Sequence, residues 1–510
     1  MKIMSLLELV FVIGCMTTAI TAAMPQYGDV CVTSRAVHPT PIGDWDTHPL
    51  LNTTGAAVSF FATRLDWVYT VDEGFIRSSP WPVTTAINAN VPDNFTGAAT
   101  YNVGRIENLY GQKLTAPWMR NWSVPPYYGC INSPVYTSIV FQRASKLVEF
   151  GSAGIQHDDP YCNADAVTWP DGGCYCSHCV QKFGDYAHAH GLAPNASFDY
   201  KSYLLEKGGY GKGSSALRVA FETFQKESVV AYHIDLRANI TAQNGGKAVT
   251  LSCNNYDATW DNITSTFDFG MCELSASSCT PSSLRSMFLH PSSGGTLPLG
   301  KAQVVTMPKL PGVTTSLKLL TRKAMGFITA LGGHMLAPWD IYLPTPNASR
   351  FYCNVSDFQD QFELVRMHNA TLREFSTVAH VGSTDVLNVT WDSIQWTINV
   401  PDNSSACPSQ LVVHAVDWDW PVLAPSSTVM YPLPANDGRG AGFTLLATKL
   451  APPCSNKSLA AVQCGILGSG LLYPIDCRVD NASMRVSFTV PGETSFLTPW
   501  SMIQMLLTWA

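Results

Sequence analysis

The sequence has few charged residues, only 14% of its 510 positions, and its formal net charge is -7. It shows no basic patch that could release phosphate counterions, and this argues against a nucleic-acid partner. It also shows no fixed-period repeat, no heptads and, beyond its first residues, no apolar run of membrane-spanning length. Because 46% of the residues are hydrophobic, the chain can bury a large core and is not a disordered protein.

Several common catalytic signatures are missing as well. No serine or cysteine nucleophile with a partner histidine emerges from the sequence. No Gly-rich phosphate loop and no redox-cofactor motif is present either. We therefore expect no cofactor.

The N-terminus resembles a secretory signal peptide over residues 1–23. Met1-Lys2 is a short basic start, residues 6–16 are mostly apolar, and residues 17–23 are mostly small. A buried N-terminal helix is the alternative interpretation. Thirteen N-x-S/T sequons and an even fourteen cysteines beyond Cys15 favour the secretory route. The sequence thus predicts a secreted or lysosomal glycoprotein with disulfides and no membrane span.

The middle of the chain alternates short apolar runs with amphipathic segments. Eight strands are predicted, at 57–65, 85–91, 113–119, 154–158, 248–253, 267–272, 303–307 and 334–338. Helical periodicity lies between them, most clearly over 135–150, 214–242, 316–331 and 357–378. Eight β-then-α units predict an α/β fold with a (β/α)8 barrel over residues 51–380, preceded by an N-terminal extension at 24–50.

After residue 380 the apolar runs become short and alternate with polar residues between Pro, Gly, Asn and Asp. Strands are predicted at 387–391, 395–400, 410–416, 428–433, 442–447, 485–490 and after residue 494. This pattern indicates an antiparallel β-sandwich domain over residues 381–510. The apolar end, residues 500–510, is interpreted as a last sandwich strand, with a lipid-anchor signal as the alternative.

Enzymes built on a (β/α)8 barrel carry their active sites at the carboxyl ends of the strands. The candidate catalytic residues are therefore sought directly after the predicted barrel strands. Asp158 and Asp159 close the fourth predicted strand, and Glu273 follows the sixth. Cleavage of a sugar linkage needs one ionised and one protonated carboxyl group. We therefore predict Asp158 as the nucleophile and Glu273 as the acid/base, with Asp159 as an alternative acid. A capping Asp-Asp-Pro turn is the structural alternative.

Further polar and aromatic residues at the strand ends are candidates for substrate binding, since tryptophan offers a flat apolar face to a sugar ring. They are Asp66, Trp67, Trp118, His157, Asn254, Trp339 and Asp340. Asp340 is also the reserve carboxylate.

A tight cysteine cluster follows the Asp158 strand. Cys162, Cys174, Cys176 and Cys179 have a spacing that can hold zinc through four thiolates. In an oxidising compartment the same residues can form two disulfides, which is the favoured interpretation. Either arrangement is structural, because four filled ligand positions leave none for a substrate water.

The segments Gly154-Ile-Gln-His-Asp-Asp-Pro160 and Gly172-Gly-Cys-Tyr-Cys-Ser-His-Cys179 resemble those of secreted (β/α)8 glycoside hydrolases, including relatives of the beta-galactosidases with cysteine clusters. The fourth strand ends in Asp-Asp rather than the Asn-Glu of beta-galactosidases. An Asp at strand four with an acid at strand six is closer to the alpha-galactosidase arrangement. The resemblance implies a barrel with a C-terminal β domain and a carbohydrate substrate. A secreted glycoside hydrolase is therefore the predicted function. The alternatives are a non-catalytic carbohydrate-binding protein on the same barrel and a zinc hydrolase that uses the cysteine cluster.

Overall fold

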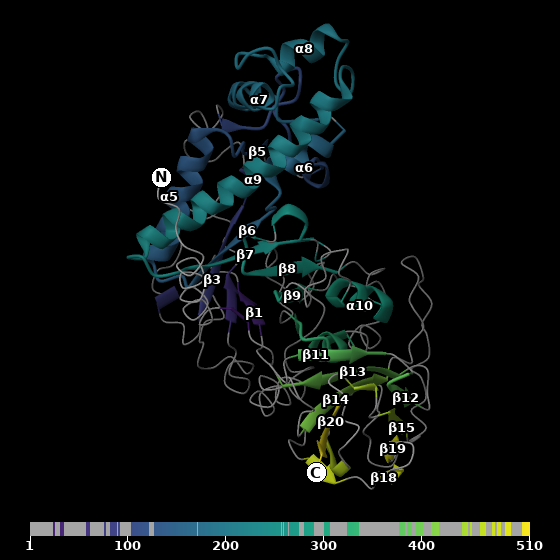
Figure 1. Cartoon of the computed structure of the whole chain (residues 1–510). Coiled ribbons are helices and arrows are strands. Elements are labelled where there is room, and N and C mark those ends of the chain that lie inside the picture. The colour runs from purple at the N-terminus through teal and green to yellow at the C-terminus, as the bar shows by residue number, and fades with distance from the viewer. Residues whose placement is uncertain are drawn as a thin grey trace, which may run out of the picture.

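The computed structural model describes much of the chain, with the longest continuous stretches at 127–170 and 172–256. The described residues are 24–25, 31–34, 58–61, 76–77, 82–88, 90–91, 104–121, 127–170, 172–256, 258, 260–263, 265–274, 280–289, 300–306, 324–335, 377–382, 385–389, 394–401, 410–417, 441–446, 449–450, 459–465, 472–474, 477–480, 485–490 and 502–509. They form a parallel sheet with helices, followed by antiparallel sheets toward the C-terminus (Figure 1).

Eight parallel strands lie in one sheet in chain order. They are β1 (Cys31–Ser34), β2 (Val58–Phe61), β3 (Val83–Asn88), β6 (Gly154–Asp158), β7 (Thr250–Asn254), β8 (Phe269–Glu273), β9 (Ala302–Thr306) and β10 (His334–Met335). All-parallel pairing in sequential order is the arrangement of a (β/α)8 barrel. The predicted fold class is confirmed.

Side chains from both ends of this strand order meet in one buried cluster. Cys31 of β1 packs with Phe269 and Met271 of β8 and with Val304 of β9. In a flat sheet β1 would lie five strands away from β8. The sheet therefore curves around a common interior, and these side chains fill it.

The eight strands are not all the ones expected from the sequence. Residues 113–119 hold only a bridge from Lys113 to Glu107 and the short 3-10 helix η3 (Pro117–Met119). Leu114, Ala116 and Met119 are buried in the core that also contains Ile87 of β3 and Ile155 of β6, so the apolar pattern alone misassigned this segment as a strand. The missing strand is β1, which comes from the segment treated as an N-terminal extension. Because one strand is lost and one gained ahead of it, β6 is still the fourth strand.

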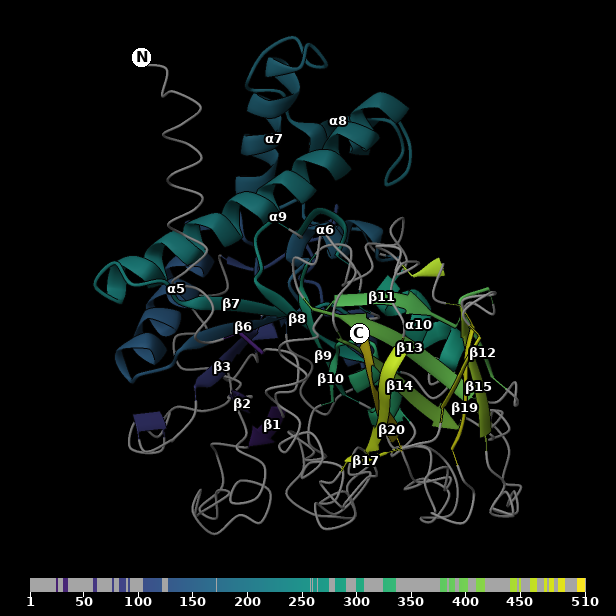
Figure 2. The ribbon, with the colours of Figure 1, turned by 60° about the horizontal axis from the view of Figure 1, so that its bottom comes forward.

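The helices cover the sheet and extend beyond it. They are α5 (Pro134–Glu149), α6 (Cys162–Thr168), α7 (Ser177–Ala189), α8 (Tyr200–Glu206), α9 (Ser215–Gln243) and α10 (Pro281–Leu289). The long α9 runs from the sheet out to α7 and α8, which lie beyond one end of the sheet (Figure 2). There Phe183, Tyr200 and Phe221 form part of a second, aromatic core. Among the described residues, no helix combines the length and apolar character needed to cross a bilayer.

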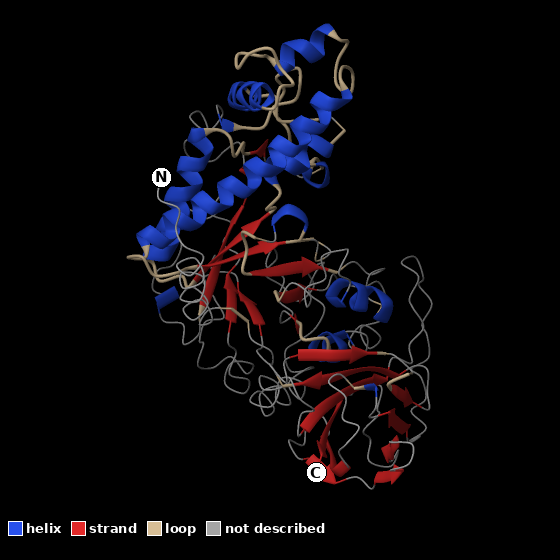
Figure 3. Ribbon diagram, in the orientation of Figure 1, coloured by secondary structure: helices blue, strands red, loops and turns tan. Residues whose placement is uncertain are grey.

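The C-terminal strands form two antiparallel sheets, with orders β11-β13-β14-β20-β16-β17 and β12-β15-β19-β18 (Figure 3). Their bounds are Thr377–Val381 (β11), Leu387–Val389 (β12), Ile394–Val400 (β13), Gln410–Asp417 (β14), Ala441–Leu446 (β15), Leu459–Gly465 (β16), Leu472–Pro474 (β17), Cys477–Asp480 (β18), Arg485–Val490 (β19) and Met502–Trp509 (β20). A small separate sheet pairs β4 (Asn90–Val91) with β5 (Tyr127–Tyr128), and η4 spans Asp261–Ile263.

The position of β20 decides how the apolar C-terminal segment is used. The segment forms a strand, as predicted, and because it pairs with β14 on one side and β16 on the other it is a central strand of the larger sheet. The larger sheet begins at β11, whose first residues the sequence assigned to the end of a helix. The predicted strand 428–433 lies outside the described residues. Thr397 of β13 donates a 2.9 Å hydrogen bond to the carbonyl of Ala330, which joins this sheet to the parallel part.

Candidate active site and cysteine cluster

Asp158 ends β6, a strand packed closely between its neighbours. A Cβ at Gly154 would lie 2.7 Å from Oγ1 of Thr84 on β3 and 3.2 Å from the carbonyl of Thr250 on β7, so only glycine fits there. At the other end of the strand, Asn254 Nδ2 donates a 2.9 Å hydrogen bond to Asp158 Oδ1. Asn254 therefore orients the Asp158 carboxyl group from the end of the next strand.

Asp158 and Glu273 lie on the same face of the sheet. Two positions earlier on each strand, Gln156 Nε2 contacts Met271 Sδ at 3.5 Å across β7. Met271 belongs to the interior cluster, so this is the inner face of the sheet. Side chains alternate along a strand, so Asp158 and Glu273 repeat this relation one step closer to the carboxyl ends.

Asp159 turns away from the strand direction. Its φ of 55° lies in the left-handed region, and its side chain is buried near Tyr256, whose hydroxyl lies 3.5 Å from Asp159 Oδ1. Burial first, and then the Asp159 charge, raise the pKa of Tyr128. Asp159 thus belongs to a buried tyrosine cluster beside Asp158 rather than to the strand face that carries Asp158.

Two residues in this region were not predicted from the sequence. Tyr256 donates a 2.6 Å hydrogen bond to Oδ2 of Asp165 on α6, and burial raises the pKa of the Asp165 carboxyl group while this hydrogen bond lowers it. Tyr256 lies two positions beyond Asn254, within the stretch considered after that strand, but tyrosine was not among the residue types taken as candidates there. Asp165 stands at no strand end, and nothing in its local sequence marks it.

Aromatic rings form one wall beside the carboxyl groups. Trp118 is 48% exposed, and its ring packs edge-on against Tyr128, Trp169 and Tyr256 at centroid distances of 6.3, 6.0 and 6.4 Å. Tyr161 stacks on the other side of Tyr256 at 5.5 Å. The buried rings hold Trp118 in place while leaving part of it open to a ligand. Trp118 lies on η3 and not at the end of a barrel strand.

His157 is not a substrate contact, which corrects the sequence-based assignment. It is fully buried, with Nδ1 2.9 Å from the carbonyl of Asp158 and Nε2 3.1 Å from the hydroxyl of Tyr232 on α9. Strand alternation places it opposite Asp158, on the outer face of the sheet. Four other predicted contacts, Asp66, Trp67, Trp339 and Asp340, lie outside the described residues.

This burial makes stability depend on pH. Burial lowers the pKa of His157 to about 4, and it lowers that of His233 as well. Below about pH 6.5 these histidines bind protons in the unfolded chain but not in the folded chain. The free energy of unfolding therefore falls as the pH drops to about 4. For His157 the expected loss is about 3 kcal/mol. Urea unfolding between pH 7 and 4 should show a smaller loss of unfolding free energy for His157→Phe than for the wild-type protein. An equal dependence of this free energy on pH in both proteins would contradict the prediction.

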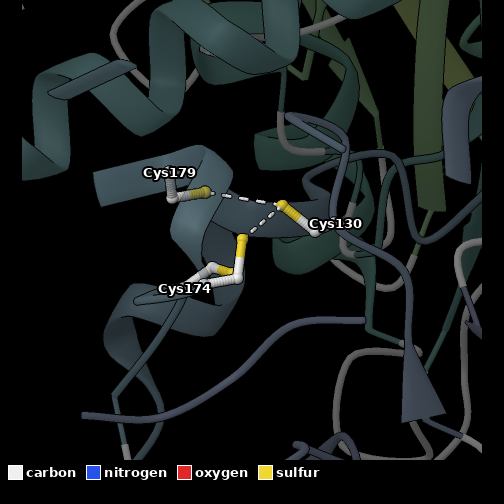
Figure 4. A group of neighbouring side chains, drawn as sticks. Cys130, Cys174 and Cys179 are labelled. Carbon is white, nitrogen blue, oxygen red and sulfur yellow. Dashed lines mark hydrogen bonds between the residues drawn. The ribbon is translucent and has the colours of Figure 1, made fainter. Parts of the chain in front are cut away.

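Four buried cysteines form a compact group of sulfur atoms (Figure 4). The Sγ atoms of Cys130, Cys174, Cys176 and Cys179 all lie within 4.8 Å of one another. Cys130 Sγ is 3.4 Å from that of Cys179 and 3.5 Å from that of Cys176. These distances are far longer than a disulfide bond of about 2.0 Å. The preference for disulfides is therefore not supported for these cysteines.

The donor set fits one zinc ion. Tetrahedral zinc with Zn–S bonds of about 2.3 Å places its sulfur ligands about 3.8 Å apart, close to the spacing here. The fourth cysteine is Cys130, which corrects the sequence-based choice of Cys162. Cys162 lies instead beside His157 and His233. These four cysteines could hold a structural metal, since no ligand position would be left for a substrate.

Solved structures of other proteins share this fold, although comparisons of sequence find no relative. No model of a protein family matches the sequence, and no curated protein does. Among solved structures, alpha-L-fucosidase isoenzyme 2 from Paenibacillus thiaminolyticus superposes with a TM-score of 0.53 at 9% identity, over 95% of this chain and 100% of that one. The alpha-amylase from H. orenii gives 0.51 at 9% identity, again over 95% and 100%. The chain has the fold of glycoside hydrolase barrel enzymes over most of its length.

Proposed function

We propose that the protein is a glycoside hydrolase that cleaves oligo- or polysaccharides with Asp158 and Glu273. The observation that carries this proposal is their common position at the carboxyl ends of β6 and β8, on the face where Gln156 meets Met271. The exposed ring of Trp118 supports it as a platform for a sugar. The fold of the two similar structures is consistent with it.

In the proposed reaction, the Asp158 carboxylate attacks the anomeric carbon while Glu273 gives its proton to the departing glycosidic oxygen. Asn254 donates a hydrogen bond to Asp158 Oδ1 and so orients the carboxylate that attacks. A water molecule then gives a proton to Glu273 and displaces Asp158 from the sugar. Two displacements restore the anomeric configuration, so we expect retention.

A panel of aryl glycosides and natural glycans, incubated with the purified full chain, tests this function. Release of the aryl group identifies the sugar, and proton NMR of the first product shows its anomeric configuration. Inversion would contradict Asp158 as a nucleophile. Glycan binding without turnover of any substrate would instead favour the alternative, a non-catalytic carbohydrate-binding protein. Activity that persists in the presence of a chelator would exclude the zinc hydrolase.

The proposal includes entry into the secretory pathway. Residues 1–23, the predicted signal peptide, lie outside the described residues. Four sequon asparagines whose side chains are described, Asn121, Asn195, Asn239 and Asn388, are all exposed, as glycan attachment requires.

Expression with residues 1–23 in a eukaryotic secretory host should therefore release the protein into the medium in glycosylated form. Enzymatic removal of N-glycans should lower its apparent mass, and peptide mass spectrometry should find glycans at these four sites. Retention inside the cell with all four sites empty would contradict secretion. Deletion of residues 1–23 is the control, and it should keep the protein inside the cell.

A further inference from the structure

Buried amide side chains surround the cysteine cluster and point at its sulfur atoms. Asn163 Nδ2 lies 3.4 Å from Cys130 Sγ and 3.3 Å from Cys179 Sγ. Asn132 Nδ2 lies 3.4 Å from Cys179 Sγ. Both amides also donate to Oε1 of Gln225 on α9, at 3.0 and 3.4 Å.

The orientation of both amides is fixed by groups that can only donate. The backbone N–H of Ile131 donates to Asn163 Oδ1 at 3.2 Å. The Lys182 ammonium group donates to Asn132 Oδ1 at 3.3 Å. Since neither donor can accept a hydrogen bond, each amide oxygen must face it, and each NH2 group must face the sulfur atoms. The cluster is therefore approached by hydrogen-bond donors.

Donors directed at sulfur favour thiolates over thiols, because a thiolate only accepts. Four thiolates around Zn²⁺ would still carry a charge of about -2, which buried amide donors and a nearby ammonium group stabilise.

We infer that Asn163 and Asn132 are the hydrogen-bond donors that hold this cluster as a zinc tetrathiolate, with Lys182 supplying countercharge through Asn132. Asn163 has a second connection. It lies on α6 two residues before Asp165, which binds Tyr256 beside the candidate active site. The same short helix therefore links the metal cluster to the aromatic wall.

The inference rests on zinc binding by the cluster, which the zinc content of the wild-type protein measures separately. Asn163→Ala and Asn132→Ala should each bind zinc about 10- to 100-fold more weakly in competition with a chromophoric chelator. The sulfur-to-cobalt charge-transfer band of the Co²⁺-loaded variants should also shift, which a purely structural role would not cause. Lys182→Gln changes an exposed residue and should keep the fold. It should weaken zinc binding less than the two asparagine variants do, and its effect should depend on the salt concentration.

Asn255→Ala is the matched control, because Asn255 is an equally buried amide that pairs with Gln303 at 3.0 Å and does not contact the cluster. It should lower stability and leave zinc affinity unchanged. The inference is overturned if Asn163→Ala keeps wild-type zinc affinity and an unshifted cobalt band. It is also overturned if the wild-type protein holds no zinc and mass spectrometry finds these four cysteines in disulfides.

Discussion

Replacement of Asp158 by glycine is expected to reduce turnover of an activated aryl glycoside by at least about 10⁴-fold, the upper end of what one positioned catalytic group contributes. The variant loses the carboxylate that Asn254 orients and that would form the glycosyl–enzyme bond. Added azide should enter the space left by the side chain and restore turnover, giving a glycosyl azide of inverted configuration. Glu273→Gln should lose about 10²- to 10⁴-fold and change the pH profile.

A matched control separates chemistry from a general loss of charge. Asp185→Asn changes an exposed carboxylate on α7, outside both strands, and should keep wild-type turnover. The assignment fails if Asp158→Gly retains near-normal turnover without azide. It also fails if Glu273→Gln has the wild-type pH profile, in which case Asp165, with its raised pKa, becomes the acid to test.

Replacement of Cys130 by serine is expected to abolish stoichiometric zinc binding and to destabilise the protein strongly. The variant keeps only three of the four buried sulfur atoms that would bind the metal. A loss of about 3–5 kcal/mol would lower the Tm by about 3–5 °C, at an unfolding entropy of about 2.1 cal/mol/K per residue. Metal analysis of the purified variant and thermal unfolding with and without added zinc measure both effects.

Cys162→Ser is the control for Cys130→Ser. Cys162 is as fully buried as Cys130 but lies in the other group, with His157 and His233. It should keep one zinc ion per chain even if its stability falls. Loss of zinc from Cys162→Ser with retention in Cys130→Ser would restore the sequence-based choice of ligands and contradict the structure.

Strands were predicted well where their pattern is local. Gly154–Asp158 has the predicted bounds, and β12, β13, β14, β15 and β19 begin and end within two residues of their predicted positions, whereas β11, β16, β17 and β18 were not predicted. Short apolar runs that end in polar residues or proline carry their own signal, because burial on a strand requires that pattern. The segment 113–119 carries the same signal without being a strand, since its apolar residues pack into the core shared by the sheet and its helices. The pattern of apolar residues indicates that a residue is buried, but it does not indicate which elements of the fold bury it.

The sequence by itself determined seven of the eight barrel strands, the carboxylates at two strand ends, and the β-rich C-terminal part, all of which depend on neighbours along the chain. Only the tertiary structure decided which distant groups meet. It brought Cys130 to the cysteine cluster in place of Cys162, paired His157 with Tyr232 of α9, and joined Asp165 to Tyr256. Such contacts join different elements, and they arise only when the curved sheet and its helices pack, so no local pattern of residue types encodes them.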